Sequence, residues 1–416
     1  MIMKTNRLST DRFNYLMGLA NMGAVFCIVW LLWYIFMHPN GVLKLYTPMY
    51  GFSLVVVFLS TIILIKDIFE FYPFPENLKK DLNVFSSGAL LTIAALLITL
   101  FIVYIIFWKF IGRFGITYFS PYSIIAAGGQ GAEIFNARET ASRAIIYFFA
   151  AFLWVSITWK AGFDNWPWHT CNRGVLAWSR LFAVLFFVTI AYALFFHPHV
   201  CYLFYPAQIN AGVESWWIPF TDTGSAFFSL GLLLCALFWV IASDLLWEGY
   251  PWKSLAKNES SSLLKGLATF IVTAVLGIII LIIMLKIMTY FWYEPFMGGQ
   301  YTDGPDFRFL HAGEVSGFLI LSSYILKYYF NNFPNTKFLL INAVVRTAIV
   351  ISGGILFHLF YYSKATELIL GKVPGIAQPD DTSLVWTLLF LSMILVHIDF
   401  FKGWPLKNRK ENQGNG

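Results

Sequence analysis

A single arginine deep within an apolar stretch raises the first question of chemistry in this chain. Arg346 comes about nine residues into the apolar segment 338–360, and Asn342 lies four residues before it, on the same face of a helix. A charge in the middle of a membrane costs at least about 2.5 kcal/mol, so the guanidinium needs a partner or a polar cavity. The expected partners are carboxylates near the ends of other apolar segments: Asp67, Asp244 and Asp399. Either a structural ion pair or a binding site for an anionic solute fits this position.

Imidazoles form a second group of side chains that could carry chemistry. Five histidines flank apolar segments on the predicted outer side: His38, His197, His199, His311 and His358. Neutral imidazole serves both as a metal ligand and as a proton-transfer group near neutral pH. These residues are therefore candidate metal ligands, although no cofactor is identified by the sequence. The alternative interpretation is a belt of amphipathic rings at the membrane interface.

Two glutamates occupy matching places at the starts of apolar segments. A Gly-Gly-Gln sequence precedes each, at 128–130 and 298–300, and the polar run that follows brings Glu139 or Glu314 to the predicted start of a helix. We treat both, with Arg346, Asn342 and His358, as candidate solute-binding residues. Glutamate in a first helical turn also interacts favourably with the helix dipole, so a capping role explains the same pattern.

The segments that must position these side chains are membrane helices. The chain of 416 residues is 58% apolar and 12% charged, with a mean hydropathy of +0.68, which excludes an ordinary soluble globule. About 20 apolar residues are needed to cross a bilayer as a helix. Ten stretches are long enough: 14–36, 50–70, 86–108, 142–160, 176–196, 225–247, 263–291, 310–330, 338–360 and 382–402. The sequence predicts an all-α, polytopic membrane bundle of about ten transmembrane helices.

A repeated phrase divides this bundle. An aromatic residue followed by proline closes every second segment: Tyr72-Pro73, Trp166-Pro167, Tyr250-Pro251, Phe333-Pro334 and Trp404-Pro405. Proline stops a helix, and aromatic rings suit the membrane interface. We predict five repeated helical hairpins, at approximately 14–74, 86–168, 176–252, 263–335 and 338–406. They form a transmembrane domain over 14–402, between an N-terminal segment 1–13 and a basic tail 403–416.

The distribution of Lys and Arg predicts the orientation. Of 28 such residues, 18 fall on the side that carries the aromatic-Pro phrases and both termini. Because positively charged loops stay inside, we expect both termini in the cytoplasm and the protein in the cell membrane. No basic patch is large enough to indicate nucleic-acid binding. The four cysteines give no disulfide framework, since two fall within predicted helices and the other two on opposite sides.

Three classes of function are compatible with these features. Chains built from internal helical repeats often move solutes at a repeat interface, so a permease for a small polar or anionic solute is the first hypothesis. A membrane-embedded enzyme or redox-complex subunit with a histidine-rich site at the outer face is the second. A non-catalytic scaffold subunit of a membrane complex is the third. The partners implied are the lipid bilayer, with a small solute or other membrane subunits according to class.

Overall fold

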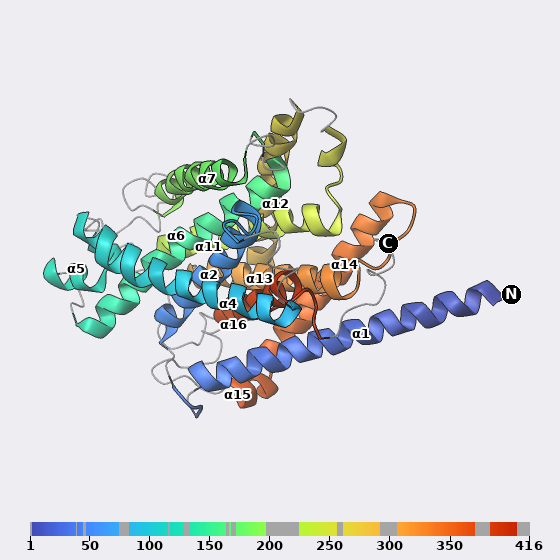
Figure 1. Cartoon of the computed structure of the whole chain (residues 1–416), viewed down its shortest axis with the longest axis horizontal. Helices are drawn as coiled ribbons and strands as arrows, with labels where there is room; N and C mark the ends of the chain where they lie inside the picture. Colours follow the sequence, from blue (N-terminus) through green and yellow to red (C-terminus); the bar gives the residue numbers. More distant parts are fainter. Residues whose placement is uncertain are drawn as a thin grey trace.

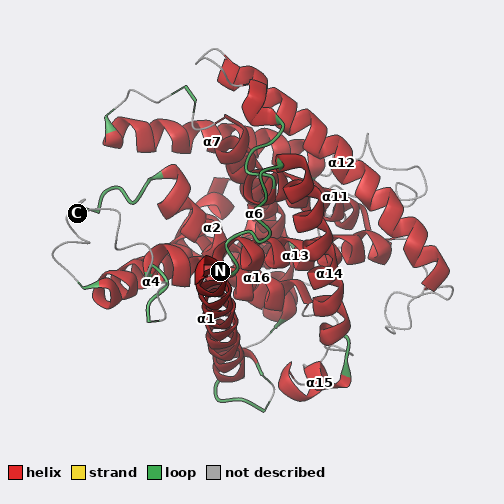
Figure 2. Cartoon of the chain, turned by 90° about the vertical axis from the view of Figure 1, so that its right-hand side faces the viewer, coloured by secondary structure: helices red, strands yellow, loops and turns green. Residues whose placement is uncertain are grey.

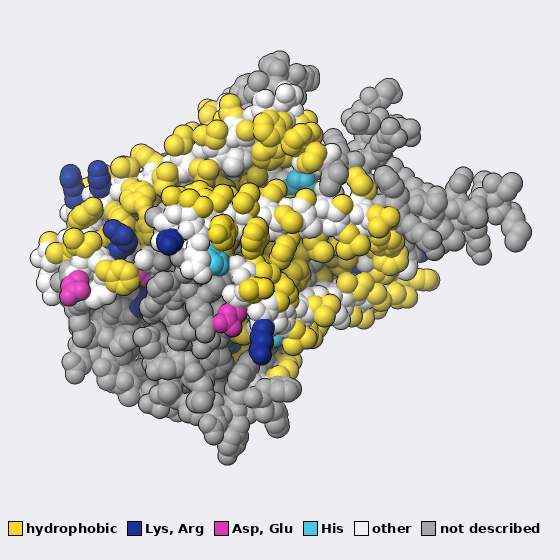
Figure 3. Space-filling view, turned by 90° about the horizontal axis from the view of Figure 1, so that it is seen from below, with side chains coloured by type: hydrophobic (Ala, Val, Ile, Leu, Met, Phe, Trp, Pro, Cys, Tyr) yellow, Lys and Arg dark blue, Asp and Glu magenta, His cyan; other side chains and the backbone are white. Residues whose placement is uncertain are grey.

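The chain is a bundle of helices. The computed structural model describes residues 2–38, 40–44, 47–74, 83–114, 117–128, 133–163, 166–167, 172–196, 224–255, 261–291, 306–370 and 383–405. No strand occurs within these ranges, and ten of their helices are long and apolar enough to cross a membrane. The prediction of an all-α protein with ten candidate spans is therefore confirmed. Figure 3 shows one face of the molecule, on which hydrophobic side chains far outnumber charged ones.

Five of the ten helices form the interior. They contain the even-numbered spans: α2 (Pro48–Ile63), α6 (Ile134–Phe163), α11 (Gly224–Ile241), α13 (Asp306–Tyr329) and α16 (Ser383–Leu395). Between 61% and 89% of their membrane-length windows is buried. Each packs on the next, in the order α2, α6, α11, α13, α16 and back to α2, so the five close into a ring. In Figure 2 their labels cluster in the middle of the molecule.

The odd-numbered spans surround this ring. They are α1 (Ile2–Leu32), α4 (Val84–Leu100), α7 (Arg173–Phe195), α12 (Ser261–Phe291) and α14 (Leu339–Tyr361), and only 17–33% of their windows is buried. Figure 1 shows α1 along one edge of the molecule, and Figure 2 places α4, α7 and α12 around the periphery. Their apolar residues face outward, as expected for helices in contact with lipid.

Each outer helix lies against two neighbouring members of the ring. α1 contacts α13 and α16; α4 contacts α2 and the end of α16; α7 contacts α6 and the end of α2. In the same way α12 contacts α6 and α11, and α14 contacts α13 and the end of α11. Four of the outer helices thus pack on the even span immediately before them in the sequence. The turn at the aromatic-Pro phrase joins the two helices of each such pair.

The aromatic-Pro phrases share one turn geometry. Each even span ends four or five residues before its proline, at Ile68, Phe163, Leu246, Tyr329 or Phe400. The five aromatic-Pro peptide bonds are cis. In four of the turns a backbone N–H donates to the carbonyl six residues earlier, from Phe71, Gly249, Asn332 and Gly403 to Ile65, Ser243, Leu326 and His397. This bond spans one residue more than that of a Schellman motif, and the donor and the residue before it have positive φ.

Short helices complete the fold. Five segments have π-helical hydrogen bonding: Trp33–Met37, Leu64–Ile68, Phe101–Phe110, Ala242–Leu246 and Val396–Phe400. Three of these form the last turn of an inner helix before the aromatic-Pro phrase. The remaining elements are α5 (Pro121–Ala126), α15 (Lys364–Leu370) and 3-10 turns at Ile111–Phe114, Thr117–Phe119 and Trp252–Leu255.

Candidate functional site

The five inner helices enclose a central cavity. Its lining comes from all five of them and follows the aromatic-Pro phrases in register. Ten residues before each proline lies one layer: Ile63, Ile157, Ile241, Tyr324 and Leu395. Fourteen residues before it lies the next: Leu59, Leu153, Leu237, Ile320 and Leu391. Seventeen residues before it lies a third, which contains two small residues: Val56, Ala150, Leu234, Gly317 and Leu388.

The cavity is narrow and apolar. These layers are separated by three or four residues, which keeps them on one face of each helix. From Phe52 to Ile63 the lining extends over 11 residues, or about 16 Å of helix. The cavity volume is about 40 Å³, and a water molecule requires roughly 10–15 Å³ measured in this way, so few molecules of that size fit. The centre of the bundle therefore holds a small apolar cavity with no room for larger solutes.

Ionisable side chains gather where the cavity approaches the aromatic-Pro turns. Lys66 Nζ and Asp399 Oδ2 are 3.0 Å apart, joining the last turn of the α2 span to that of the α16 span. Both lie close enough to Tyr328 to interact with it electrostatically, as do Asp67 and Asp244. Three carboxylates and one ammonium therefore interact electrostatically with Tyr328, one turn beyond the lining residue Tyr324.

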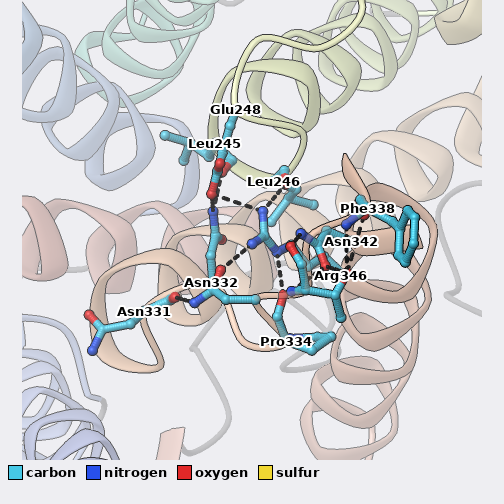
Figure 4. Close-up of polar contacts among 11 residues, drawn as sticks. Leu245, Leu246, Glu248, Asn331, Asn332, Pro334, Phe338, Asn342 and Arg346 are labelled. Carbon is cyan, nitrogen blue, oxygen red and sulfur yellow. Dashed lines mark hydrogen bonds and ion pairs between the residues drawn. The ribbon is translucent and has the colours of Figure 1, made fainter. Parts of the chain in front are cut away.

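Arg346 lies away from this cavity, in a network between helices. Its side chain is almost completely buried on α14, where Nη1 donates to Glu248 Oε1 at 3.0 Å and to the carbonyl of Leu246 at 2.8 Å. Nε donates to the carbonyl of Pro334 at 3.2 Å, and Nη2 donates to Asn335 Oδ1. Figure 4 shows the guanidinium between the end of the α11 span and the aromatic-Pro turn after α13.

These contacts confirm that Arg346 faces the bundle and meets a carboxylate. The expected partner was wrong, because Glu248, at the start of an aromatic-Pro phrase, takes the place expected for Asp67, Asp244 or Asp399. Burial alone would raise the pKa of Glu248. The charge of Arg346, hydrogen bonds from Asn332 and Arg346 and the charge of Lys327 more than offset this effect, so the pKa is lowered.

Asn342 supports the same turn. Its Oδ1 accepts from the backbone N–H of Thr336 at 2.9 Å and from the Thr336 hydroxyl at 2.6 Å, while its Nδ2 donates to the Thr336 carbonyl at 2.9 Å. One turn of α14 below Arg346, this amide therefore fixes the segment that leads from the aromatic-Pro turn into the helix (Figure 4). Arg346 and Asn342 are thus brought together, and both bind backbone groups of the turn.

A second arginine makes an equivalent contact elsewhere in the bundle. Arg180, buried on α7, donates from Nη1 to Glu70 Oε1 at 2.7 Å. Glu70 and Glu248 each lie three residues before the proline of their phrase. Arg180 lies 13 residues after Pro167, and Arg346 lies 12 residues after Pro334. The sequence interpretation missed Arg180, although its distance from the preceding proline was a usable signal.

The opposite end of α13 carries a buried polar cluster. His311 Nδ1 and Glu314 Oε2 are 2.6 Å apart, and both residues are about 6% exposed. The hydroxyl of Tyr362 donates to the same carboxylate oxygen at 3.2 Å. The ring of His358 packs on Tyr362, with centroids 4.6 Å apart. Three sequence-predicted candidates, His311, Glu314 and His358, are therefore brought to one place.

Glu139 has a different role from Glu314. Its two carboxylate oxygens accept from the backbone N–H groups of Met49 at 3.0 Å and Tyr50 at 3.3 Å. A side chain of α6 thus satisfies donors in the first turn of α2, at the positive end of that helix dipole. This geometry agrees with the capping interpretation, applied to a neighbouring helix.

The remaining histidine candidates do not join the cluster at Glu314. His38 is buried at the end of the first span, where its Nδ1 accepts from the backbone N–H of Asn40 at 2.9 Å. His197 and His199 lie outside the described residues. Within the described part of the chain, no group of three or more His, Cys, Asp or Glu residues is arranged to hold a metal ion.

The cavity lining includes none of the residues that the sequence interpretation selected as candidate solute ligands. That interpretation looked for polar groups, whereas the lining is apolar except for Thr387 and the hydroxyl of Tyr324. Comparison of the chain with protein-family models, with curated proteins and with solved structures found no match in any of the three. The function must therefore be argued from the ring and its two polar ends.

Proposed function

We propose that the protein is a membrane permease and that its solute passes through the ring of inner helices. The observation that carries this proposal is the cavity whose layers contain one residue from each of the five. A scaffold helix bundle has no need of a central cavity, because close packing of the same helices would be more stable. Under this proposal the five aromatic-Pro phrases mark five structural repeats around the passage, and the protein lies in the cell membrane with both termini in the cytoplasm.

The layer fourteen residues before each proline is the proposed gate. All five of its residues are Leu or Ile, and an apolar constriction of this kind excludes water and ions until it widens. Opening requires small shifts of the inner helices, which the π-helical last turns at Leu64–Ile68, Ala242–Leu246 and Val396–Phe400 would have to accommodate.

A small uncharged or cationic solute fits this passage best. Arg346, which favoured an anion when only the sequence was considered, binds protein groups. Near the turns, three carboxylates and a single ammonium interact electrostatically with Tyr328. An excess of carboxylates attracts cations and repels anions.

Two substitutions of opposite effect test the passage. A Cβ at Gly317 would lie in ordinary contact with Thr387 and slightly closer to Leu384, so Gly317→Phe would add a ring to the layer seventeen residues before the prolines. We expect this variant to abolish flux. Ile320→Ala removes bulk from the gate layer, and we expect it to raise flux. Gly23→Phe is the matched control, since Gly23 lies on the outer helix α1 with nothing within 4 Å of an added Cβ.

Stopped-flow light scattering of proteoliposomes would measure entry of glycerol, urea and ammonium chloride. Wild-type flux above that of protein-free vesicles, lost in Gly317→Phe and kept in Gly23→Phe, supports the proposal. Failure of all three solutes to enter faster than in empty vesicles would refute it. Equal flux in all variants would show that the route lies outside the ring.

A second candidate function rests on the His311–Glu314 pair. A buried carboxylate that holds an imidazole at 2.6 Å is the arrangement of a general base and its orienting group. An enzyme acting at this end of α13 would use it. The Glu314→Gln substitution would then abolish turnover and leave solute flux through the ring unchanged. A reaction that depends on Glu314, combined with solute flux that Gly317→Phe does not change, would favour the enzyme.

A further inference from the structure

A crevice opens between two outer helices on the side of the bundle that faces lipid. It lies between α12 and α14, over the end of the α11 span, and has a volume of about 520 Å³. Its walls are mainly apolar, and include Trp239, Trp247, Leu276, Leu340, Val344 and Ile351. Both α12 and α14 contact the α11 span, so the floor of the crevice is formed by an inner helix.

Two polar side chains in the wall, those of Trp247 and Thr347, are hydrogen-bonded within the protein. Trp247 Nε1 donates to Thr347 Oγ1 at 2.9 Å, and Thr347 Oγ1 in turn donates to the carbonyl of Ala343 at 2.8 Å. Hydrogen bonds of this kind leave an apolar surface toward the open side. The crevice therefore suits a hydrocarbon chain better than a hydrogen-bonding solute.

The length of the crevice matches one leaflet of a bilayer. Lining residues recur on α14 from Leu340 through Val344 and Thr347 to Ile351, in a single stripe. The 11 residue-to-residue steps from Leu340 to Ile351 correspond to about 16 Å of helix. Half of a bilayer hydrocarbon core is about 15 Å thick. The stripe therefore extends from the level of the aromatic-Pro turn at Tyr250-Pro251 to the middle of the membrane.

Positive charges flank the end of the crevice at the turns. Lys253 lies two residues after Pro251, and Lys337 lies three residues before Leu340; both are exposed. The acidic residue of this region, Glu248, is already paired with Arg346. Ammonium groups at this level are placed to meet the phosphate of a lipid headgroup.

We propose that this crevice binds one phospholipid with an anionic headgroup, from the leaflet on the side of the aromatic-Pro turns. One acyl chain lies between α12 and α14 against Trp239 and Trp247, and the headgroup lies near Lys253 and Lys337. This site is separate from the central passage, and the proposal does not depend on what the protein transports.

Native mass spectrometry would test the site, with the full chain released from mixed vesicles of phosphatidylglycerol and phosphatidylcholine. We expect one retained phosphatidylglycerol per wild-type chain. Ala348→Phe places a ring in the crevice and should reduce retention at least fivefold. Ile349→Phe is the matched control, because Ile349 is exposed on the next position of α14 but does not line the crevice. Lys253→Gln with Lys337→Gln should keep one lipid bound while removing the preference for phosphatidylglycerol.

Quenching of tryptophan fluorescence by lipids with brominated acyl chains provides a second measurement, which does not require the Ala348→Phe variant. Wild-type protein should be quenched more strongly than Trp247→Phe at equal lipid content. The proposal is overturned if no lipid is retained, or if Ala348→Phe and Ile349→Phe retain it equally. It is also overturned if wild-type chains leave the vesicle as dimers that Ala348→Phe dissociates, since a second copy would then cover the crevice.

Discussion

Arg346 and Glu248 join an outer helix to the end of an inner one, through an Nη1–Oε1 distance of 3.0 Å. Arg180 and Glu70 do the same at 2.7 Å between α7 and the end of the α2 span. In both pairs the arginine is almost completely buried, whereas the carboxylate is more than two-fifths exposed. The arginine therefore depends on protein groups for its polar contacts, including two backbone carbonyls in the case of Arg346, whereas the carboxylate can also be solvated by water.

Removal of the Arg346 side chain should destabilise the protein. Arg346→Ala eliminates hydrogen bonds to Glu248, Leu246, Pro334 and Asn335 and leaves a void between α14 and α11. We expect a loss of about 2 kcal/mol, typical of charged hydrogen bonds, seen as a lower melting temperature in detergent. Arg346→Lys should recover only part of this loss, because an ammonium cannot reproduce the planar fork. A melting temperature of Arg346→Ala equal to that of wild type would show that these hydrogen bonds do not stabilise the protein.

The two arginine–glutamate pairs should act independently. They share no residue and join different helices, and effects of independent sites usually add to within about 0.5 kcal/mol. We expect Arg180→Ala to destabilise by an amount similar to Arg346→Ala, and the double variant to lose the sum. Thermal unfolding followed by size-exclusion chromatography measures all three. A double variant no less stable than either single one would show that the pairs belong to one cooperative unit.

Acid should weaken the contact made by Glu248. Its pKa is lower in the folded protein than the ordinary value of about 4.3, so its stabilisation is complete above that value and is lost as the pH falls through the folded pKa. Glu248→Gln should therefore melt at a lower temperature than wild type at pH 7, with the difference shrinking below about pH 4. Glu133→Gln, at an exposed position, is the control and should show no such dependence. A difference that stays constant with pH would argue against the ion pair.

The excess of Lys and Arg at the aromatic-Pro end predicts that this end faces the cytoplasm. In a cysteine-free background, Lys253→Cys should react with a membrane-impermeant maleimide only after the cells are opened. Ala126→Cys, on the exposed side of α5 between the third and fourth spans, should react in intact cells. The reverse labelling pattern would show that the protein has the opposite orientation in the membrane. Labelling of both positions from outside would show that the predicted number of spans between them is wrong.

The number of spans and the position of the turns could be predicted from the sequence because each has a local cause. Apolar length determines a membrane helix, and proline stops one within a few residues. The ring could not be predicted in the same way, because the neighbours of an inner helix are set by packing between segments far apart in the sequence. Lys66 and Asp399, for example, come from the second and the tenth spans.

The candidate site was only partly accessible from the sequence. His311, Glu314 and His358 were selected for their chemistry and do lie together. The lining of the cavity was missed because Leu59, Leu153 and their equivalents look like ordinary membrane residues. Counting back from each proline would have shown that they occupy one level. Arg346 was recognised because a charged side chain in the hydrocarbon core is energetically unfavourable. That argument did not indicate which of several carboxylates would pair with the guanidinium.

The order of helices around the ring has a consequence for synthesis. α16 is the last inner helix to emerge from the ribosome, and it packs between α13 and α2. Until it inserts, the flank of α2 that it will cover, including Lys66, remains exposed to lipid or to an insertion factor. A ribosome that stalls before residue 383 would therefore leave an open horseshoe of four inner helices. Such a nascent chain would have no enclosed passage, however well its earlier segments had folded.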